Sequence, residues 1–189
     1  MGLSVRPEPA TERTAYLSEN SRRFEYLRQN LNICAPWYDA GMGVSLTRDM
    51  LSAHFDRCPI TTDLNLNNHL LPYRDSRFQT ITHLEVVEHL LNPLFALSEA
   101  ARILKPGGVM YLTTPNDYSL IYKLEHLLSR KYGPHFHQFS ERDLRWLLGA
   151  AGFEITRLET FRRSWKGKIA RFCNNSFFVE ATKRKNGPL

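Results

Sequence analysis

The segment EVVEH brings three side chains that can bind a cation or move a proton close together, Glu85, Glu88 and His89. On a helix, residues three and four apart share one face. Two carboxylates beside an imidazole suit an oxygen-preferring divalent ion such as Mg²⁺ or Mn²⁺, or Fe²⁺. A fourth ligand is available from His135 or His137 further along the chain. The alternative interpretation is a polar first helical turn, in which the helix dipole favours the glutamates.

A second candidate site is the glycine-containing loop DAGMG, which runs from Asp39 to Gly43. Gly41 and Gly43 would let the backbone approach a nucleotide-like ligand, and the N-terminus of the following helix supplies free N–H groups. Asp63 follows Gly43 at about 20 residues, a spacing typical of an acid that binds ribose hydroxyls. The alternative interpretation is that these residues form ordinary turns. The segment before the loop is also a poor strand, because Pro36 cannot donate a hydrogen bond within a strand ladder.

The elements that must position these residues alternate between strands and helices. Apolar or β-branched runs predict strands at 60–63, 78–84, 109–113, 153–161 and 176–182. Apolar residues at helical spacing, with capping residues, predict helices at 18–31, 45–55, 93–105, 118–128 and 140–152. This alternation is typical of a mostly parallel α/β sheet.

Two of the predicted helices begin at recognisable capping residues. Asn92 is a favourable N-cap, and Pro93 suits the first helical position. Ser140, three residues before Asp143, forms another helix-start signature. The segment KPGG, residues 105–108, predicts a tight structural turn between a helix and a strand.

The 189 residues, 42% of them apolar, predict one domain with a substantial core. We expect a loose leader at 1–17, the domain at 18–183 and a basic tail at 184–189. The sequence contains neither a run of about 18 apolar residues nor a secretory signal. The three cysteines are far apart, which favours reduced thiols. We therefore expect a cytoplasmic protein without a membrane span, and the sequence carries no signal for an oligomeric state.

The ordered set of motifs resembles the class I S-adenosylmethionine-dependent methyltransferases. The resemblance runs from about Tyr38 to Phe161 and is strongest between Leu71 and Gly152. In order, the matching pieces are D-x-G-x-G, LPYxDSxF, EVVEHL, ARILKPGG, TTPN and the HFHQFS segment before the helix that ends in AAGF.

The resemblance implies a Rossmann-like sheet with an antiparallel last strand, and S-adenosylmethionine bound near the ends of the first strands. It implies that the loop beginning at Asp39, with Gly41 and Gly43, faces the methionine part of the cofactor. By the same resemblance Asp63 would hold the ribose, and Glu85 would sit beside the transferred methyl group.

A narrower resemblance concerns the metal. Small-RNA 2′-O-methyltransferases and some quinone-pathway O-methyltransferases share an E-x-x-E-H segment. In the RNA enzymes both glutamates, that histidine and a later histidine bind a divalent ion. The matching residues are Glu85, Glu88, His89 and His135. Many small-molecule methyltransferases carry the same string without a known metal.

The sequence departs from the family in its N-terminal half. Only eight residues separate Asp63 from Pro72, too few for the strand and helix that the family has there. One βα unit is therefore expected to be missing. Either Asp63 ends the second strand and the third unit is absent, or Asp63 belongs to the third strand and lies near the adenine. The family's usual Asp after Phe78 is replaced by Gln79.

Three functions remain open. The first is O-methylation of a small-molecule or saccharide acceptor, with His89 or His135 as general base or with metal assistance. The second is a catalytically weak or inactive methyltransferase-like binding subunit. The missing βα unit in the N-terminal half, where the cofactor would bind, is consistent with this function. The third is metal-assisted RNA ribose 2′-O-methylation, consistent with the net charge of +6, although 189 residues leave no room for a separate RNA-binding domain.

Overall fold

A computed structural model describes residues 23–41, 46–62, 64–116, 136–161 and 176–184. Residues 23–30 are helical. The elements that follow are β1 (Trp37–Asp39), α2 (Leu46–Phe55), β2 (Phe78–Leu84), the short 3₁₀ helix η1 (Val87–His89), α3 (Pro93–Ile103), β3 (Leu104–Pro115), α5 (Glu141–Ala150), β4 (Phe153–Phe161) and β5 (Ser176–Lys183). Among these residues, no helix is long and apolar enough to cross a membrane.

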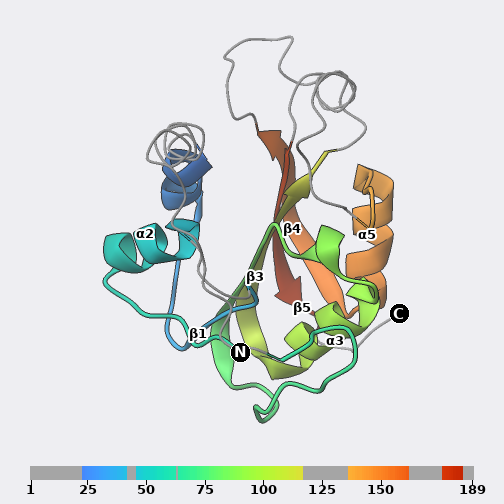
Figure 1. The fold of residues 1–189 in the computed structure, drawn as a ribbon, viewed down its shortest axis with the longest axis horizontal. Helices are drawn as coiled ribbons and strands as arrows, with labels where there is room; N and C mark the ends of the chain where they lie inside the picture. Colours follow the sequence, from blue (N-terminus) through green and yellow to red (C-terminus); the bar gives the residue numbers. More distant parts are fainter. Residues whose placement is uncertain (1–22, 42–45, 63, 117–135, 162–175, 185–189) are drawn as a thin grey trace, which may run out of the picture.

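The strands form one sheet in the order β1-β2-β3-β5-β4 (Figure 1). The first three strands are parallel to one another, and β5 runs antiparallel to both of its neighbours, β3 and β4. The expected α/β sheet with an antiparallel last strand is therefore confirmed. Parallel pairing brings the carboxyl ends of β1, β2 and β3 to the same edge of the sheet.

On the outer side of β1, which is the edge of the sheet, a single residue of the described chain pairs with the sheet. Ile60 forms an isolated parallel bridge with Tyr38, donating from its backbone N–H to the Trp37 carbonyl at 2.8 Å. In residues 61–77, Asp63 apart, the chain forms only turns and bends before β2 begins. The strand predicted at 60–63 is thus reduced to one bridge, because the chain leaves the sheet at once. Its place beside β1 favours the reading in which this segment is the second strand.

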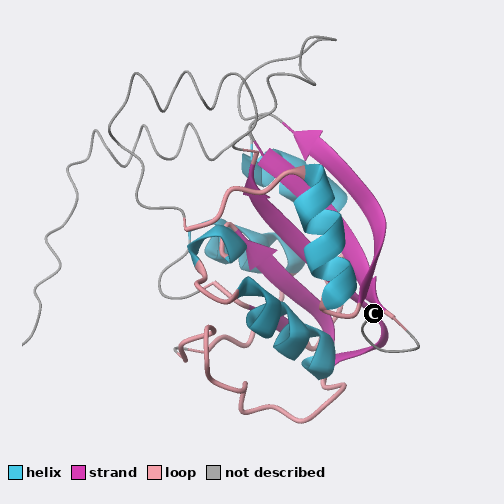
Figure 2. Ribbon diagram, turned by 90° about the vertical axis from the view of Figure 1, so that its right-hand side faces the viewer, coloured by secondary structure: helices cyan, strands magenta, loops and turns pink. Residues whose placement is uncertain are grey.

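Helices cover both faces of the sheet. In Figure 1, α2 lies on one side of the sheet, and α3 and α5 lie on the other; Figure 2 shows α3 and α5 from their own side. Alternate residues of β3 point to opposite faces. Met110 and Leu112 pack in the cluster under α3 and α5, whereas Tyr111 packs with Leu27 and Leu51 under the other helices. The sheet is therefore the middle of three layers.

Local signals explain where the helices begin. The Asn92 side chain accepts a hydrogen bond from the Phe95 N–H, and Pro93 occupies the first turn, as predicted. Ser140 and Asp143 form a reciprocal capping box at the start of α5. The KPGG segment, by contrast, lies within β3, which begins at Leu104 directly after α3. The strand is therefore longer than the predicted 109–113.

Candidate active site

The candidate site lies at the carboxyl ends of β1, β2 and β3, where parallel α/β sheets bind their ligands. The residue after β2, Glu85, donates its backbone N–H to the Thr113 carbonyl of β3 at 2.9 Å. On the other side of β2, Ala40 donates to the Thr82 carbonyl at 2.9 Å. The segments that follow β1 and β2 are thus fixed to the sheet at their first residues.

Asp39 turns back into the protein at the end of β1. Its side chain is buried and accepts a hydrogen bond from the Thr82 hydroxyl at 2.5 Å. Burial raises the pKa of Asp39 to about 6, against the opposing effect of the Thr82 hydrogen bond. A Cβ on Gly41 would stand 3.0 Å from the Asp39 Oδ2. The absence of a side chain at Gly41 therefore leaves room for the Asp39 carboxylate.

Glu85 lies outside the helical turn in which the sequence placed it. Its φ is 55°, a left-handed conformation, and η1 begins only at Val87. The prediction that Glu85, Glu88 and His89 share one helix face is therefore wrong. The ladder between β2 and β3 continues to the backbone of Glu85, and its left-handed backbone then redirects the chain. Such a conformation is unfavourable for a residue with a side chain and is enriched at functional sites.

Arg23, which the sequence interpretation missed, contacts Glu85 from the first described helix. Its Nη2 lies 3.1 Å from the Glu85 Oε1 and donates to the Thr113 hydroxyl at 2.9 Å. Arg23 is 7% exposed. The signal that indicates its burial is its spacing of four residues from Leu27, because both then fall on the apolar stripe of the helix.

Glu88 is buried on the opposite face of the sheet. Thr114, the neighbour of Thr113 on β3, donates its hydroxyl to the Glu88 Oε2 at 3.0 Å. The Glu88 Oε1 has no hydrogen-bond partner among the described residues. Burial, followed by the charge of Glu85, raises the pKa of Glu88 to about 8. Its burial therefore favours the protonated form of Glu88.

His89 lies at the end of η1, next to this buried acid. Its Nε2 is 3.9 Å from the Glu88 Oε1, and its side chain is about half exposed. The Glu88 carbonyl accepts hydrogen bonds from the backbone N–H groups of Phe136 and His137, at 2.9 and 3.3 Å. These bonds fix η1 against the segment that leads into α5.

A cavity of about 520 Å³ opens beside Glu85 and His89. Its lining is Asn65, Leu66, Asn67, Glu85, Val86, His89 and Leu90. One wall therefore comes from the irregular connection before β2, and the other from the segment after β2. Its volume lies within the range of small-molecule and cofactor sites.

The metal site stays a prediction. Within the described ranges, no group of three His, Cys, Asp or Glu side chains is arranged to hold an ion. One of the proposed ligands, Glu85, is paired with a buried guanidinium, which disfavours a second cation there. His135, the fourth predicted ligand and second candidate base, lies outside the described residues, as do Gly43 and Asp63 of the cofactor set.

Comparisons with known proteins identify the family of the chain. Residues 20–158 match a family described as the methyltransferase domain. A probable S-adenosylmethionine-dependent methyltransferase of Mycolicibacterium smegmatis is 26% identical over 131 residues, covering 65% of this chain and 50% of that protein. A ubiquinone biosynthesis O-methyltransferase of Cereibacter sphaeroides is 36% identical over 64 residues, covering 33% of this chain and 26% of that protein.

The fold likeness covers more of the chain. A crystal structure from Thermotoga maritima, described as an S-adenosylmethionine-dependent methyltransferase and possible histamine N-methyltransferase, superposes with a TM-score of 0.64 at 18% identity. The match covers 92% of this chain and 96% of that one. The chain spans about half the length of the Mycolicibacterium relative and about a quarter of the Cereibacter relative. The chain belongs to the methyltransferase-domain family and has the fold of the class I S-adenosylmethionine-dependent methyltransferases.

Proposed function

We propose that the chain binds S-adenosylmethionine at the carboxyl ends of β1 and β2 and methylates an oxygen of a small-molecule or saccharide acceptor. The cavity of about 520 Å³ beside Glu85 carries this proposal. It lies at the edge of the sheet where α/β folds bind nucleotide-like ligands. The loop from Asp39, in which Gly41 leaves room for the turned-back carboxylate, borders the same edge.

The chain's own residues fit a cofactor of this kind. The proposed cofactor set is the loop containing Asp39, Gly41 and Gly43, with Asp63 for the ribose and Glu85 beside the methyl group. Arg23 holds the Glu85 carboxylate in place through an ion pair of 3.1 Å. When bound, S-adenosylmethionine supplies a methyl group made electrophilic by its sulfonium. The protein's task is then to align the acceptor and the methyl group.

His89 is the proposed proton acceptor among the described residues. A hydroxyl acceptor loses its proton on methylation, and an imidazole exchanges protons at neutral pH. His89 lines the cavity, and its Nε2 lies 3.9 Å from the Glu88 Oε1. Glu88 would help to orient the ring, because its Oε1, which has no hydrogen-bond partner among the described residues, lies close to that nitrogen. His135 is proposed as a second base on the sequence resemblance alone.

The oxygen acceptor is favoured by the curated relatives of the ubiquinone pathway. They are described as O-methyltransferases, and they match a third of this chain. A hydroxyl also fits the presence of a histidine at the cavity, since transfer to an already deprotonated nitrogen needs no base there.

A second candidate function is a methyltransferase-like subunit that binds a partner without methylating. The observation in its favour is the outer side of β1, away from β2, where Ile60 is the one described residue that pairs with this strand. Such a subunit would bind S-adenosylmethionine weakly, because the missing βα unit would no longer contribute to the cofactor site.

Calorimetry with S-adenosylmethionine and S-adenosylhomocysteine tests the proposed function. We expect saturable binding of both by the wild-type chain, and weaker binding by Glu85→Gln. Glu154→Gln is the matched control, because Glu154 is exposed on β4, at a distance from this edge. An acceptor panel of phenols and sugars, read by mass spectrometry for the gain of a methyl group, then identifies the substrate class. No heat of binding at millimolar cofactor would sink the proposal.

A further inference from the structure

The connection that replaces the missing βα unit is held by α3 at two points. Residues 61–77 have no helix or strand of their own in the described chain, so they need support from elsewhere. One attachment is Asn67, at the start of α3. The other is the pair Glu99 and Arg102, near its end.

The first attachment runs through the Asn67 side chain. Its Oδ1 accepts hydrogen bonds from the Leu91 and Asn92 N–H groups, at 2.6 and 3.0 Å. The N–H of the N-cap residue Asn92 has no partner within the helix, and Leu91 precedes the helix, so both groups need an acceptor from outside it. Asn67 in turn donates its backbone and side-chain N–H groups to the Asn65 Oδ1, at 3.0 and 2.8 Å. The two loop asparagines and the start of α3 therefore form one hydrogen-bonded unit.

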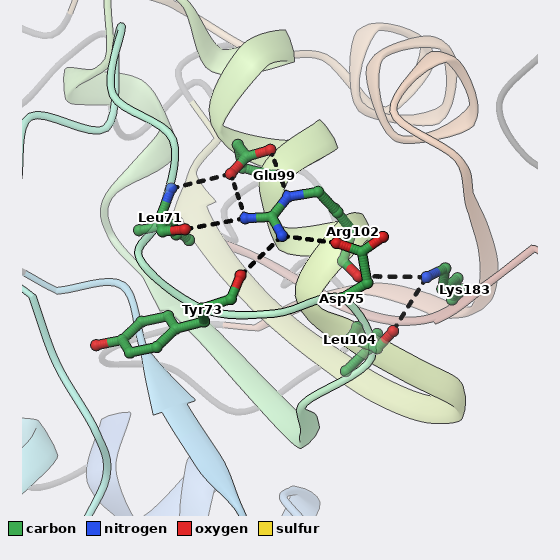
Figure 3. Close-up of polar contacts among 7 residues, drawn as sticks. All are labelled: Leu71, Tyr73, Asp75, Glu99, Arg102, Leu104 and Lys183. Atoms are coloured by element: carbon green, nitrogen blue, oxygen red, sulfur yellow. Dashed lines mark hydrogen bonds and ion pairs between the residues drawn. The ribbon is translucent and has the colours of Figure 1, made fainter.

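The second attachment is shown in Figure 3. Glu99 is buried and accepts from the Leu71 N–H at 2.9 Å. Arg102 donates to the carbonyls of Leu71 and Tyr73, at 3.0 and 2.8 Å, and to both oxygens of Glu99. Because this attachment lies at the far end of α3 from the cavity, it fixes the connection without touching the site.

Asn67 joins the two walls of the cavity. Asn65, Leu66 and Asn67 form one wall, and Val86, His89 and Leu90 belong to the other. The bonds from Asn67 reach Leu91, the residue directly after Leu90. The separation of the walls is therefore set at one end by this side chain. The described residues of the segment 61–77 contain no helix that could do so instead.

We propose that Asn67 is a positioning residue for the methyl donor: it holds the loop 65–67 against the start of α3 and so fixes the width of the cofactor cavity. This inference rests on the proposed function. It predicts that Asn67→Ala weakens binding of S-adenosylmethionine by about tenfold, the equivalent of losing one or two net hydrogen bonds. Asn67→Asp keeps the accepting oxygen but loses the side-chain donor to the Asn65 Oδ1, so it should restore only part of the affinity.

The test combines binding with a readout on the free protein. Calorimetry with S-adenosylmethionine and S-adenosylhomocysteine compares the wild type with Asn67→Ala, Asn67→Asp and Asn68→Ala. Asn68 is the adjacent, exposed asparagine and serves as the matched control. Amide hydrogen exchange without ligand follows the Leu91 and Asn92 N–H groups, which should lose protection in Asn67→Ala alone.

A further variant separates positioning from stability. Arg102→Met weakens the second attachment, far from the cavity, and thermal unfolding measures its loss of stability. The proposal predicts that it keeps near wild-type affinity below its unfolding temperature. Equal affinity loss in Arg102→Met and Asn67→Ala would overturn it, as would unchanged affinity or unchanged amide protection in Asn67→Ala. A wild-type chain that binds neither compound refutes the proposed function itself, and with it this inference.

Discussion

The guanidinium of Arg23 lies 3.1 Å from the carboxylate of Glu85, so the first described helix is joined to the turn after β2. Replacing Arg23 by Met would leave Glu85 without its counter-charge and the Thr113 hydroxyl without its donor. We expect a loss of about 2–3 kcal/mol in the free energy of unfolding, less than for a fully buried pair because Glu85 keeps some exposure. Urea unfolding measures it.

A double-mutant cycle isolates the pair. Glu85→Gln alone should also destabilise the protein, and the double variant Arg23→Met with Glu85→Gln should cost less than the sum of the single changes. Simple additivity would show that the two charges do not interact in solution.

Glu88 should make the stability of the protein depend on pH. Its pKa is raised to about 8 in the folded protein, chiefly by burial, above the ordinary range of a glutamate. The folded state therefore binds more protons than the unfolded state between the two values, and stability falls as pH rises from about 4.5 towards 8. Glu88→Gln should remove this part of the slope. Unfolding free energies across this pH window are the measurement, with the exposed Glu141→Gln as control. A slope that persists in Glu88→Gln assigns the effect to another group.

Arg102 should matter more for stability than an exposed arginine with a similar ion pair. It donates to two carbonyls and two carboxylates, and its partner Glu99 is buried. Arg102→Met should cost about 2–3 kcal/mol, since several charge-assisted bonds are lost together. Arg145→Met, which breaks the exposed pair with Glu141 on α5, should cost about 0.5 kcal/mol or less. Chemical denaturation of both variants measures the two losses in unfolding free energy. Similar losses would contradict the interpretation that the buried contacts of Arg102 stabilise the protein more than an exposed ion pair.

Gly41→Ala should disturb the end of β1. The new Cβ would stand 3.0 Å from the Asp39 Oδ2, so the carboxylate, whose Oδ1 accepts the Thr82 hydrogen bond, must move by a few tenths of an ångström. We expect a loss of about 1 kcal/mol in stability together with weaker binding of S-adenosylmethionine. Thermal unfolding and calorimetry measure the two effects. A variant that matches the wild type in both would show that the loop relaxes freely.

Much of the fold was predictable because its signals are local. The strand at Phe78–Leu84 was predicted with the observed bounds, since a β-branched and aromatic run identifies it. The starts of α3 and α5 followed from Asn92 and Ser140, whose side chains contact residues three positions away. The tertiary arrangement of the last strand came from the family resemblance.

The site was less predictable because long-range contacts determine it. Glu85 reads as the start of a helix in sequence, but its bond to Thr113, on another strand, holds its backbone in the sheet. The spacing of Arg23 from Leu27 indicates its burial, but its contact with Thr113 is apparent only once the helix is placed against β3. The role of Asn67 depends on Leu91 and Asn92, which reach it only in the folded chain. His89 and Glu85 line one cavity, although they do not share the helix face that their spacing predicted.

The antiparallel strand β5 also shapes how the protein can be synthesised. It fills the place between β3 and β4, although about 60 residues of chain separate it from the end of β3. Until the ribosome has released residues 176–183, β3 therefore carries an unpaired edge, with its hydrogen-bonding groups open to other chains. The nascent protein consequently passes through an aggregation-prone stage that ends only when its last described strand is inserted.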